Sequence, residues 1–119
     1  MAKRNAFRAH LHRKAAGSSA DVLEYPEEKP VSRGERHHVT LLAYRDQDNA
    51  PTSVQIRVRK GSNDHYYYEQ ATPTANLIYT WDDEVVLTEG ERLQVYFNGA
   101  TAVDDLEVWL QGWSTEEQS

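Results

Sequence analysis

The most regular pattern in the chain is an alternation of apolar and polar residues near its end. Every second residue is apolar in residues 92–98, and residues 106–111 repeat this alternation. A period of two is typical of strands that bury one face. Tyr96 and Trp109 fall on the two faces that should contact water. If the two strands pair as a hairpin, these aromatics form one exposed patch. The predicted core positions are Leu93, Val95, Phe97, Leu106, Val108 and Leu110.

Shorter runs with the same period extend back to residue 37. Val39, Leu41 and Ala43 alternate with polar residues, although Leu42 interrupts the polar face. Turn-rich segments separate the runs every ~8–12 residues, which is typical of a sandwich or a small barrel. We therefore expect residues 36–113 to form a small all-β domain, an antiparallel β-sandwich of the jelly-roll kind.

Residues 1–35 show almost no such alternation. They begin with a basic segment and continue into a stretch that contains two prolines. A spacing of four between Phe7 and Leu11, followed by Gly17, matches a short helix with a glycine stop. Such a helix is marginal in water unless it packs on something. We expect this segment to be an extended or partly helical N-terminal arm that orders on a partner, and residues 114–119 to be an acidic tail.

Composition narrows the classes of protein. A length of 119 residues bounds the chain to one domain, and the absence of cysteine excludes disulfides, thiol chemistry and cysteine-ligated metals. We find no apolar run of membrane-spanning length and no signal-peptide pattern, so we expect a chain made in the cytoplasm and not secreted. Residues 1–14 hold five bases and no acid, so the net charge of −6 leaves −11 on the other 105 residues. An acidic body argues against nucleic acid as a partner.

Candidate catalytic and metal-binding groups do not form a recognisable motif. His37 and His38 are adjacent, and adjacent strand residues point to opposite faces, so they cannot share one metal ion without a bend. The acids at residues 82–84 and at Asp104 and Asp105 fall between strands, where solvated turns carry such residues. The glycine motifs of nucleotide and acyl-transfer sites are absent. We therefore expect no enzyme activity, no metal and no cofactor. Calcium in the acidic loops is an alternative, although their spacing matches no EF-hand loop.

Two features indicate contact surfaces. The first is the density of aromatic residues, which core packing, a protein interface or sugar stacking would each explain. The second is the basic arm, which suits a solubilising tail, a phosphate-binding segment or a segment that docks on an acidic protein surface. Its apolar residues favour docking, on another copy of the chain or on a different protein. The expected arm anchors are Arg4, Phe7, Arg8, Leu11 and Arg13, and the expected body contacts are Tyr67, Tyr96, Trp109 and Trp113.

The last quarter of the chain resembles the minor virion proteins of tailed bacteriophages, especially jelly-roll-like decoration (cement) proteins and some neck or tail proteins. In these proteins a strand is entered by a Gly-acidic turn, here residues 89–92. A small-residue loop, here residues 99–102, leads to a last strand that ends in glycine and an aromatic, here Gly112 and Trp113. The resemblance implies a protein present in many copies on a capsid, often as trimers, with arms that reach over neighbouring subunits.

From this resemblance we expect a structural virion protein that decorates and stabilises a capsid. Its expected partners are the major capsid protein or other virion subunits, and further copies of itself, with a trimer favoured. No membrane contact is expected. A neck or tail protein is the nearest alternative, and a carbohydrate-binding β-sandwich module is the alternative from a different class. An enzyme is the third alternative.

Overall fold

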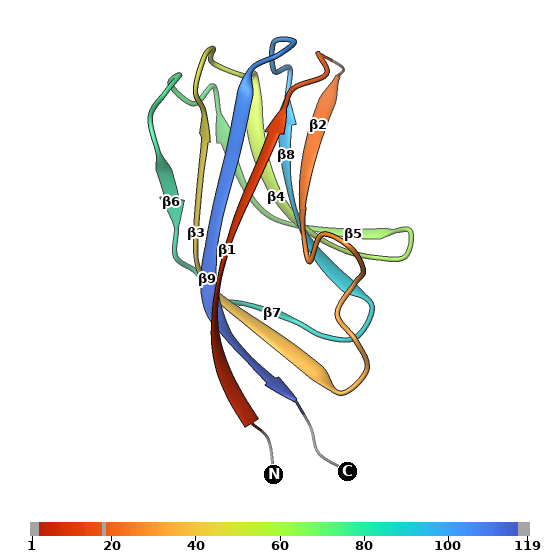
Figure 1. The fold of residues 1–119 in the computed structure, drawn as a ribbon. Helices are drawn as coiled ribbons and strands as arrows, with labels where there is room; N and C mark the ends of the chain where they lie inside the picture. The colour runs from red at the N-terminus through yellow and green to blue at the C-terminus, as the bar shows by residue number, and fades with distance from the viewer. Residues whose placement is uncertain (1–2, 18, 117–119) are drawn as a thin grey trace.

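The computed structural model describes residues 3–17 and 19–116, most of which lie in strands. The strands are β1 (Lys3–Lys14), β2 (Ala20–Tyr25), β3 (Glu35–Asp46), β4 (Ser53–Lys60), β5 (Asn63–Ala71), β6 (Tyr79–Trp81), β7 (Val85–Leu87), β8 (Glu91–Asn98) and β9 (Asp105–Glu116) (Figure 1). Among the described residues there is no helix of the length and hydrophobicity needed to cross a membrane.

The strands form two antiparallel sheets that pack face to face (Figure 1). One sheet has the order β1-β9-β3-β6, and β7 pairs with the part of β3 that β6 leaves free. The other sheet has the order β2-β8-β4-β5. The expected all-β, antiparallel sandwich is therefore confirmed. The inner faces of the sheets meet in one core, whose largest fully buried side chains are Tyr44, Phe97, Leu42, Ile56, Leu87, Leu93 and Leu106.

The expected N-terminal arm is wrong, because β1 and β2 are strands of the sandwich. β1 pairs with β9 over its whole length, and β2 pairs with β8. Leu11 is only 3% exposed and belongs to the core. Its spacing of four from Phe7 fits a helix and a strand equally well, and on a strand both side chains face inward. The sandwich therefore begins at Lys3 instead of residue 36.

The C-terminal boundary also lies further along the chain than expected. β9 continues to Glu116, three residues past the expected end of the domain at Trp113. Residues 114–116 pair with β1 and β3, so they are part of the sheet. The rest of the expected acidic tail, residues 117–119, lies outside the described residues.

The last two strands do not form a hairpin. β8 belongs to the four-stranded sheet and β9 to the five-stranded sheet, so residues 99–104 cross from one layer to the other. The alternation fits both arrangements, because the apolar faces point to the core in each of them. The expected joint patch of Tyr96 and Trp109 is therefore wrong, since the two side chains lie on opposite outer faces. Gly99 begins the crossing with a φ of 72°, and a Cβ there would lie 2.3 Å from the Oγ1 of Thr52.

A β-bulge in β3 explains why Leu42 interrupted the alternation in the sequence. The pairing of β3 with β9 shifts by one residue between Val39 and Leu41. Beyond this bulge Leu42 and Tyr44 are buried in the core, whereas Leu41 and Ala43 line a pocket on the outer face. Strict alternation from Val39 places Leu41 and Ala43 inside, and this expectation is wrong because the extra residue exchanges the two faces.

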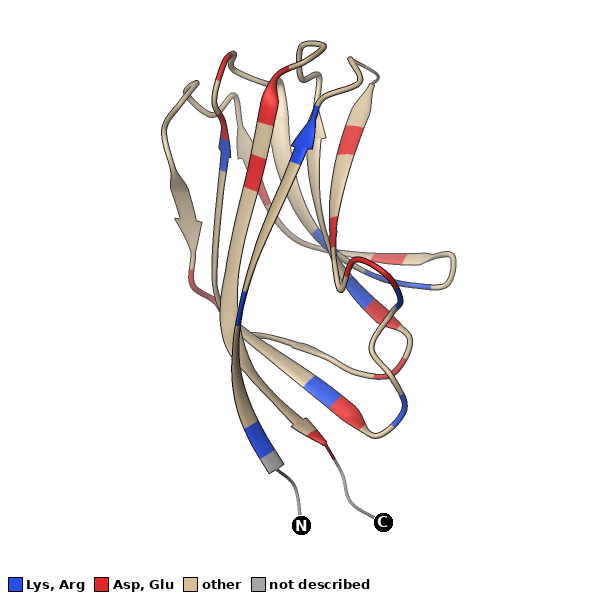
Figure 2. Ribbon diagram, viewed as in Figure 1, with Lys and Arg blue, Asp and Glu red and all other residues tan. Residues whose placement is uncertain are grey.

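Acidic residues gather at the end of the sandwich where β3 ends and β9 begins (Figure 2). β1 brings its own basic residues to the same end. The Nζ of Lys14 lies 2.9 Å from a carboxylate oxygen of Asp105, and a guanidinium nitrogen of Arg13 lies 3.8 Å from Asp21. Of the basic residues that were expected to reach a partner, Arg13 thus faces an acidic residue of the same chain.

Candidate functional site

The outer face of the five-stranded sheet carries two tryptophans and a set of charged side chains. Trp109 and Trp113 lie four residues apart in β9, so both side chains point to this face. β9 has β1 on one side and β3 on the other. In the pairing register Trp109 is opposite His10 of β1, and Trp113 is opposite His38 of β3. The two flanking strands therefore supply the neighbours of both tryptophans.

Trp113 is held between a histidine and an arginine. The His38 ring stacks on it with a centroid separation of 3.5 Å and an interplanar angle of 10°. The guanidinium carbon of Arg4 lies 4.1 Å from the centroid of the indole, a cation–π contact. Because Arg4 comes from β1 and His38 from β3, the two groups cover opposite faces of the ring. Only the edge of the indole is left to contact another molecule.

Trp109 also lies between a histidine and an arginine, but here the histidine comes from β1 and the arginine from β3. The His10 ring from β1 is parallel to the indole, with a centroid separation of 5.2 Å and an interplanar angle of 1°. The guanidinium carbon of Arg45 from β3 lies 5.5 Å from the indole centroid. A sugar ring stacks on a free aromatic face, and the faces of both indoles already have a histidine ring or a guanidinium as neighbour. The arrangement instead presents two indole edges with cationic groups beside them.

Two adjoining pockets occupy the surface around the tryptophans. The first has a volume of about 520 Å³ and the second about 440 Å³, and both are lined by Arg8 and Gln111. Leu41 and Ala43, placed outward by the bulge, form an apolar part of the first pocket. The remaining lining residues are Ala9, His10, Trp109 and Leu110 in the first, and Ala6, Phe7, Thr40, Gly112 and Trp113 in the second.

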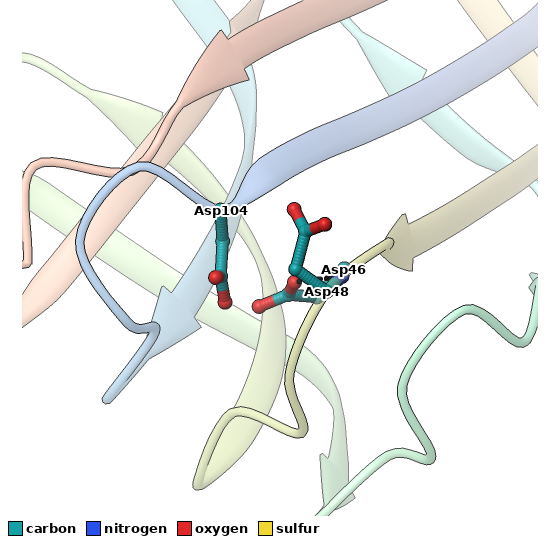
Figure 3. A group of neighbouring side chains, drawn as sticks. All are labelled: Asp46, Asp48 and Asp104. Atoms are coloured by element: carbon teal, nitrogen blue, oxygen red, sulfur yellow. Dashed lines mark hydrogen bonds between the residues drawn. The ribbon is translucent and has the colours of Figure 1, made fainter.

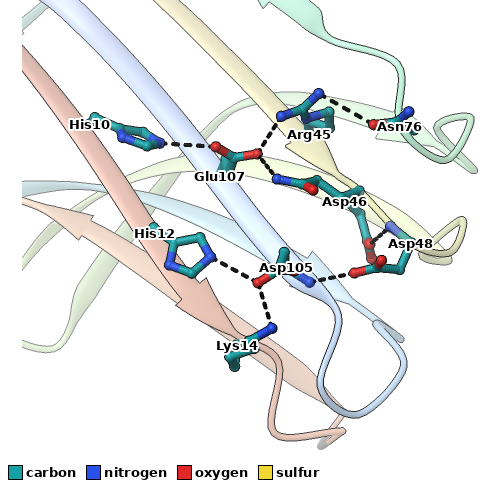
Figure 4. A network of polar contacts seen from close by, with 10 residues as sticks. His10, His12, Lys14, Arg45, Asp46, Asp48, Asn76, Asp105 and Glu107 are labelled. Carbon is teal, nitrogen blue, oxygen red and sulfur yellow. Dashed lines mark hydrogen bonds and ion pairs between the residues drawn. The ribbon is translucent and has the colours of Figure 1, made fainter.

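A buried carboxylate fixes the groups that flank Trp109 (Figure 4). Glu107 is 7% exposed, and its carboxylate accepts hydrogen bonds from His10 at 3.1 Å, from Arg45 at 2.5 Å and from Gln47. Burial by itself raises the pKa of Glu107, but these three hydrogen bonds outweigh it and hold the pKa below its usual value. The carboxylate is therefore ionised at neutral pH and keeps His10 and Arg45 in position beside the indole.

A second carboxylate joins β1 to β9 nearer the acidic end (Figure 4). Asp105 accepts a hydrogen bond from His12 at 2.9 Å and lies 2.9 Å from the Nζ of Lys14. The bond from Lys14, followed by the one from His12, lowers the pKa of Asp105, and the same contact raises the pKa of Lys14. Exposed ion pairs of this kind add little stability, so the network mainly sets the orientation of side chains.

Three further carboxylates meet at the same end (Figure 3). One of them, Asp104, belongs to an acidic loop for which calcium was an alternative in the sequence analysis. One carboxylate oxygen from each of Asp46, Asp48 and Asp104 lies within 4.8 Å of the other two. Burial, and then the contact with Asp104, raise the pKa of Asp46 to about 6. The backbone hydrogen bonds to Asp46 act in the opposite direction. The arrangement is that of a small oxygen-lined site at the end of the sandwich.

The structure distributes the nine predicted contact residues over several surfaces. Arg4, Arg8, Trp109 and Trp113 share the outer face just described. Tyr96 lies on the opposite outer face, where the guanidinium of Arg57 is 3.8 Å from its centroid. Tyr67 is half-exposed on β5, edge-on to the Trp81 ring at 6.2 Å. Leu11 lies in the core, Phe7 stacks on Tyr25 at 5.2 Å, and Arg13 donates a hydrogen bond to the carbonyl of Val22.

Sequence reasoning missed the partners of the two tryptophans. His10 and His38 were not assigned a contact role, and Arg45 and Glu107 were not singled out. The signal was present in β1, where inward Phe7 alternates with outward charged residues, but it was interpreted as a helix. His37 and His38 do point to opposite faces. The Nδ1 of His37 shares a hydrogen bond of 2.9 Å with the Tyr25 hydroxyl on the inner side, whereas His38 stacks on Trp113 on the outer face.

Comparison with known proteins supplies no family for this arrangement. No protein-family model matches the chain, and no curated protein sequence matches it.

Proposed function

We propose that the sandwich is a jelly roll. The support is its strand order, once β6 and β7 are counted as one interrupted strand beside β3. The first strand then pairs with the eighth, the second with the seventh, the third with the sixth and the fourth with the fifth. This is the order of one long hairpin of eight strands rolled into two sheets. Jelly rolls are found in viral capsid proteins, lectins and cupins, so the order favours these classes by analogy of fold.

We propose that the protein is a non-enzymatic virion subunit that decorates and stabilises a bacteriophage capsid. It binds a neighbouring protein through the outer face of β1, β9 and β3. The observation that carries this proposal is that Trp109 and Trp113 are each fixed between a histidine and an arginine. Tryptophan and arginine are enriched among residues that dominate binding energy, and side chains fixed before binding lose little entropy on association.

The chemistry of this face suits a protein surface better than a carbohydrate. The pockets combine an apolar part with Arg8 and Gln111, and the indole edges present N–H donors. Because the faces of both indoles have neighbours, this surface lacks the open stacking platform that a carbohydrate-binding module uses. The partner in this proposal is the major capsid protein or another virion subunit. A place in the neck or tail is the alternative within the same class.

Co-sedimentation tests the proposal. The full chain is mixed with genome-free shells of the virus that encodes it, and bound protein is measured after pelleting. We expect Trp113→Ala and Trp109→Ala each to weaken binding at least ~10-fold, because truncation of a central anchor costs about 2 kcal/mol. Tyr96→Ala, an aromatic truncation on the opposite face, is the matched control and should bind like the wild type.

Two results would overturn the assignment of the face. One is unchanged binding of both tryptophan variants when their melting temperatures show that they are folded. The other is an equal loss in the Tyr96→Ala control. Binding to a glycan array that Trp113→Ala abolishes would establish the carbohydrate-binding alternative instead.

Light scattering on the purified chain tests the proposed trimer, and a monomer at all concentrations contradicts it.

A further inference from the structure

Three carboxylates converge between the end of β3 and the start of β9 (Figure 3). Asp46 is the last residue of β3, Asp48 lies in the loop that follows, and Asp104 immediately precedes β9. Asp46 is 4% exposed and Asp104 is 2% exposed, whereas Asp48 is exposed. One oxygen of each lies within 4.8 Å of the other two. Two of the three negative groups are thus enclosed by protein, and the third leaves the cluster open to solvent on one side.

Hydrogen bonds hold each carboxylate by one oxygen only. The Oδ1 of Asp46 accepts the backbone N–H groups of Asp48 at 3.1 Å and Asn49 at 3.3 Å. The Oδ1 of Asp104 accepts the Asn49 side-chain amide at 2.8 Å, and the Oδ2 of Asp48 accepts the N–H of Asp105 at 2.7 Å. The second oxygens of Asp46 and Asp104 are buried and have no hydrogen-bond partner within the described residues. Buried carboxylate oxygens without a partner are strongly unfavourable and rare in folded proteins.

Within the described residues no base contacts the cluster directly, and Lys14 attracts Asp48 only at longer range. Among the residues that the structure describes, no ion pair involves Asp46, Asp48 or Asp104. The nearest bases are engaged elsewhere: Lys14 pairs with the neighbouring Asp105, and Arg45 pairs on the outer face of the sheet. A cation from solution is the simplest group that satisfies both the free oxygens and the charge.

We propose that Asp46, Asp48 and Asp104 bind a calcium ion at this end of the sandwich. The donors are all oxygens, which excludes the nitrogen and sulfur ligands that zinc prefers. Oxygens on opposite sides of a calcium ion are at most ~5 Å apart, because each lies about 2.3–2.6 Å from the ion, and the observed limit of 4.8 Å falls within that span. Magnesium needs oxygens at about 2.0–2.1 Å in a regular octahedron, a closer arrangement. Water completes the coordination on the side of exposed Asp48.

The ion would have a defined structural effect. It would tie the loop after β3 to the crossing segment that precedes β9, two segments that the sequence separates by more than fifty residues. It would also remove the repulsion between the two buried carboxylates. This site lies outside the tryptophan-bearing face, and it does not depend on the proposed virion function.

Calorimetry and thermal melting of the full chain test the proposal. The protein is stripped with a chelator, dialysed and titrated at neutral pH with calcium chloride, and in parallel with magnesium chloride. We expect one calcium ion per chain with a dissociation constant of about 10⁻⁴–10⁻³ M, the weak end of the range of protein calcium sites. The melting temperature should rise by several degrees when calcium reaches about 100 times that constant.

Variants assign the effect to the cluster. Asp104→Asn should weaken calcium binding at least ~10-fold while preserving the size of the side chain. Asp48→Ala should do the same at an exposed position, where it removes one hydrogen bond to the N–H of Asp105. Asp83→Asn is the matched control, because it removes the same charge from another acidic loop, and its response should equal that of the wild type. The proposal is overturned if about 10 mM calcium produces neither heat nor a melting shift. It is also overturned if magnesium acts equally well or if Asp83→Asn loses the response as well.

Discussion

The incorporation of β1 into the core gives a direct prediction for Leu11→Ala. Leu11 is 3% exposed, and its side chain packs in the core from a strand at the edge of its sheet. Leucine-to-alanine changes in protein cores cost about 3–5 kcal/mol, with the lower values where the surroundings can relax. An edge strand relaxes more readily than a central one, so we expect a loss of about 3 kcal/mol. This is a large part of the ~5–15 kcal/mol by which a domain is stable.

The expected shift in melting temperature follows from the size of the chain. An unfolding entropy of ~2.1 cal/mol/K per residue gives about 0.25 kcal/mol/K for 119 residues, so 3 kcal/mol corresponds to about 12 °C. Urea titration followed by tryptophan fluorescence and circular dichroism measures the free energy of unfolding directly. Arg8→Ala is the control, because Arg8 is exposed on the other face of the same strand, and it should change stability by less than ~0.5 kcal/mol.

Two outcomes would refute this account of β1. One is a loss below about 1 kcal/mol for Leu11→Ala at an unchanged denaturant slope, since a buried leucine in a packed core cannot be so dispensable. The other is a cooperative unfolding transition of normal size after deletion of residues 1–16. Either result would mean that the N-terminal segment is an arm after all.

Three further predictions concern single side chains. Gly112→Ala should lower the free energy of unfolding by more than about 3 kcal/mol in a urea titration. The added Cβ would lie 1.8 Å from the backbone oxygen of His38 and would push β3 away from β9. A loss under about 1 kcal/mol would contradict this contact. The pKa of Glu107 is lower in the folded protein than in the unfolded chain. Its carboxylate therefore stabilises the fold above the unfolded pKa near 4.5, and this stabilisation is lost as the pH falls through the folded pKa. Urea midpoints of Glu107→Gln should therefore lie below wild type at pH 7 and converge with it in strong acid; a constant difference would contradict the ion pairs. The contribution of Asp46 to stability has the opposite pH dependence, because its pKa is raised to about 6 in the folded state. The stability is greatest below the unfolded pKa near 3.8 and falls as the pH rises through the folded pKa of about 6. With a chelator present at pH 7, Asp46→Asn should therefore be more stable than wild type by about 3 kcal/mol, with no difference near pH 3. A less stable variant would contradict the unpaired carboxylates.

The sequence predicted the fold class because strand alternation is a local signal. It could not predict which strands pair, because pairing is decided by the total burial that the whole chain achieves. The pattern of β8 and β9 satisfies a hairpin and a crossing between sheets equally well. The single extra residue in β3, between Val39 and Leu41, also has no local signature, yet it decides which of Leu41 and Leu42 is buried.

The candidate sites were predictable only in part, for the same reason. Trp109 stood out because a large aromatic occupied a position expected to contact water, and Trp113 stood out as the aromatic that ends the last strand. Their partners come from β1 and β3, and nothing local to Arg4 or His38 indicates an indole beside them. The carboxylates of Asp46 and Asp104 are more than fifty residues apart in the sequence, and each by itself resembles an ordinary turn residue.

In the proposed binding function, the N-terminal strand contributes directly to the contact face. Its outward residues Arg4, Arg8 and His10 form one side of the tryptophan-bearing face. Its pairing with β9 also fixes the register of that strand on one side, while β3 fixes it on the other. A slip of one residue would turn Trp109 and Trp113 into the core, so the ladder that stabilises the sandwich also determines which face carries the two indoles. Substitutions in the inward side of β1 should therefore impair binding through stability, whereas substitutions of its outward residues should impair binding in a folded protein.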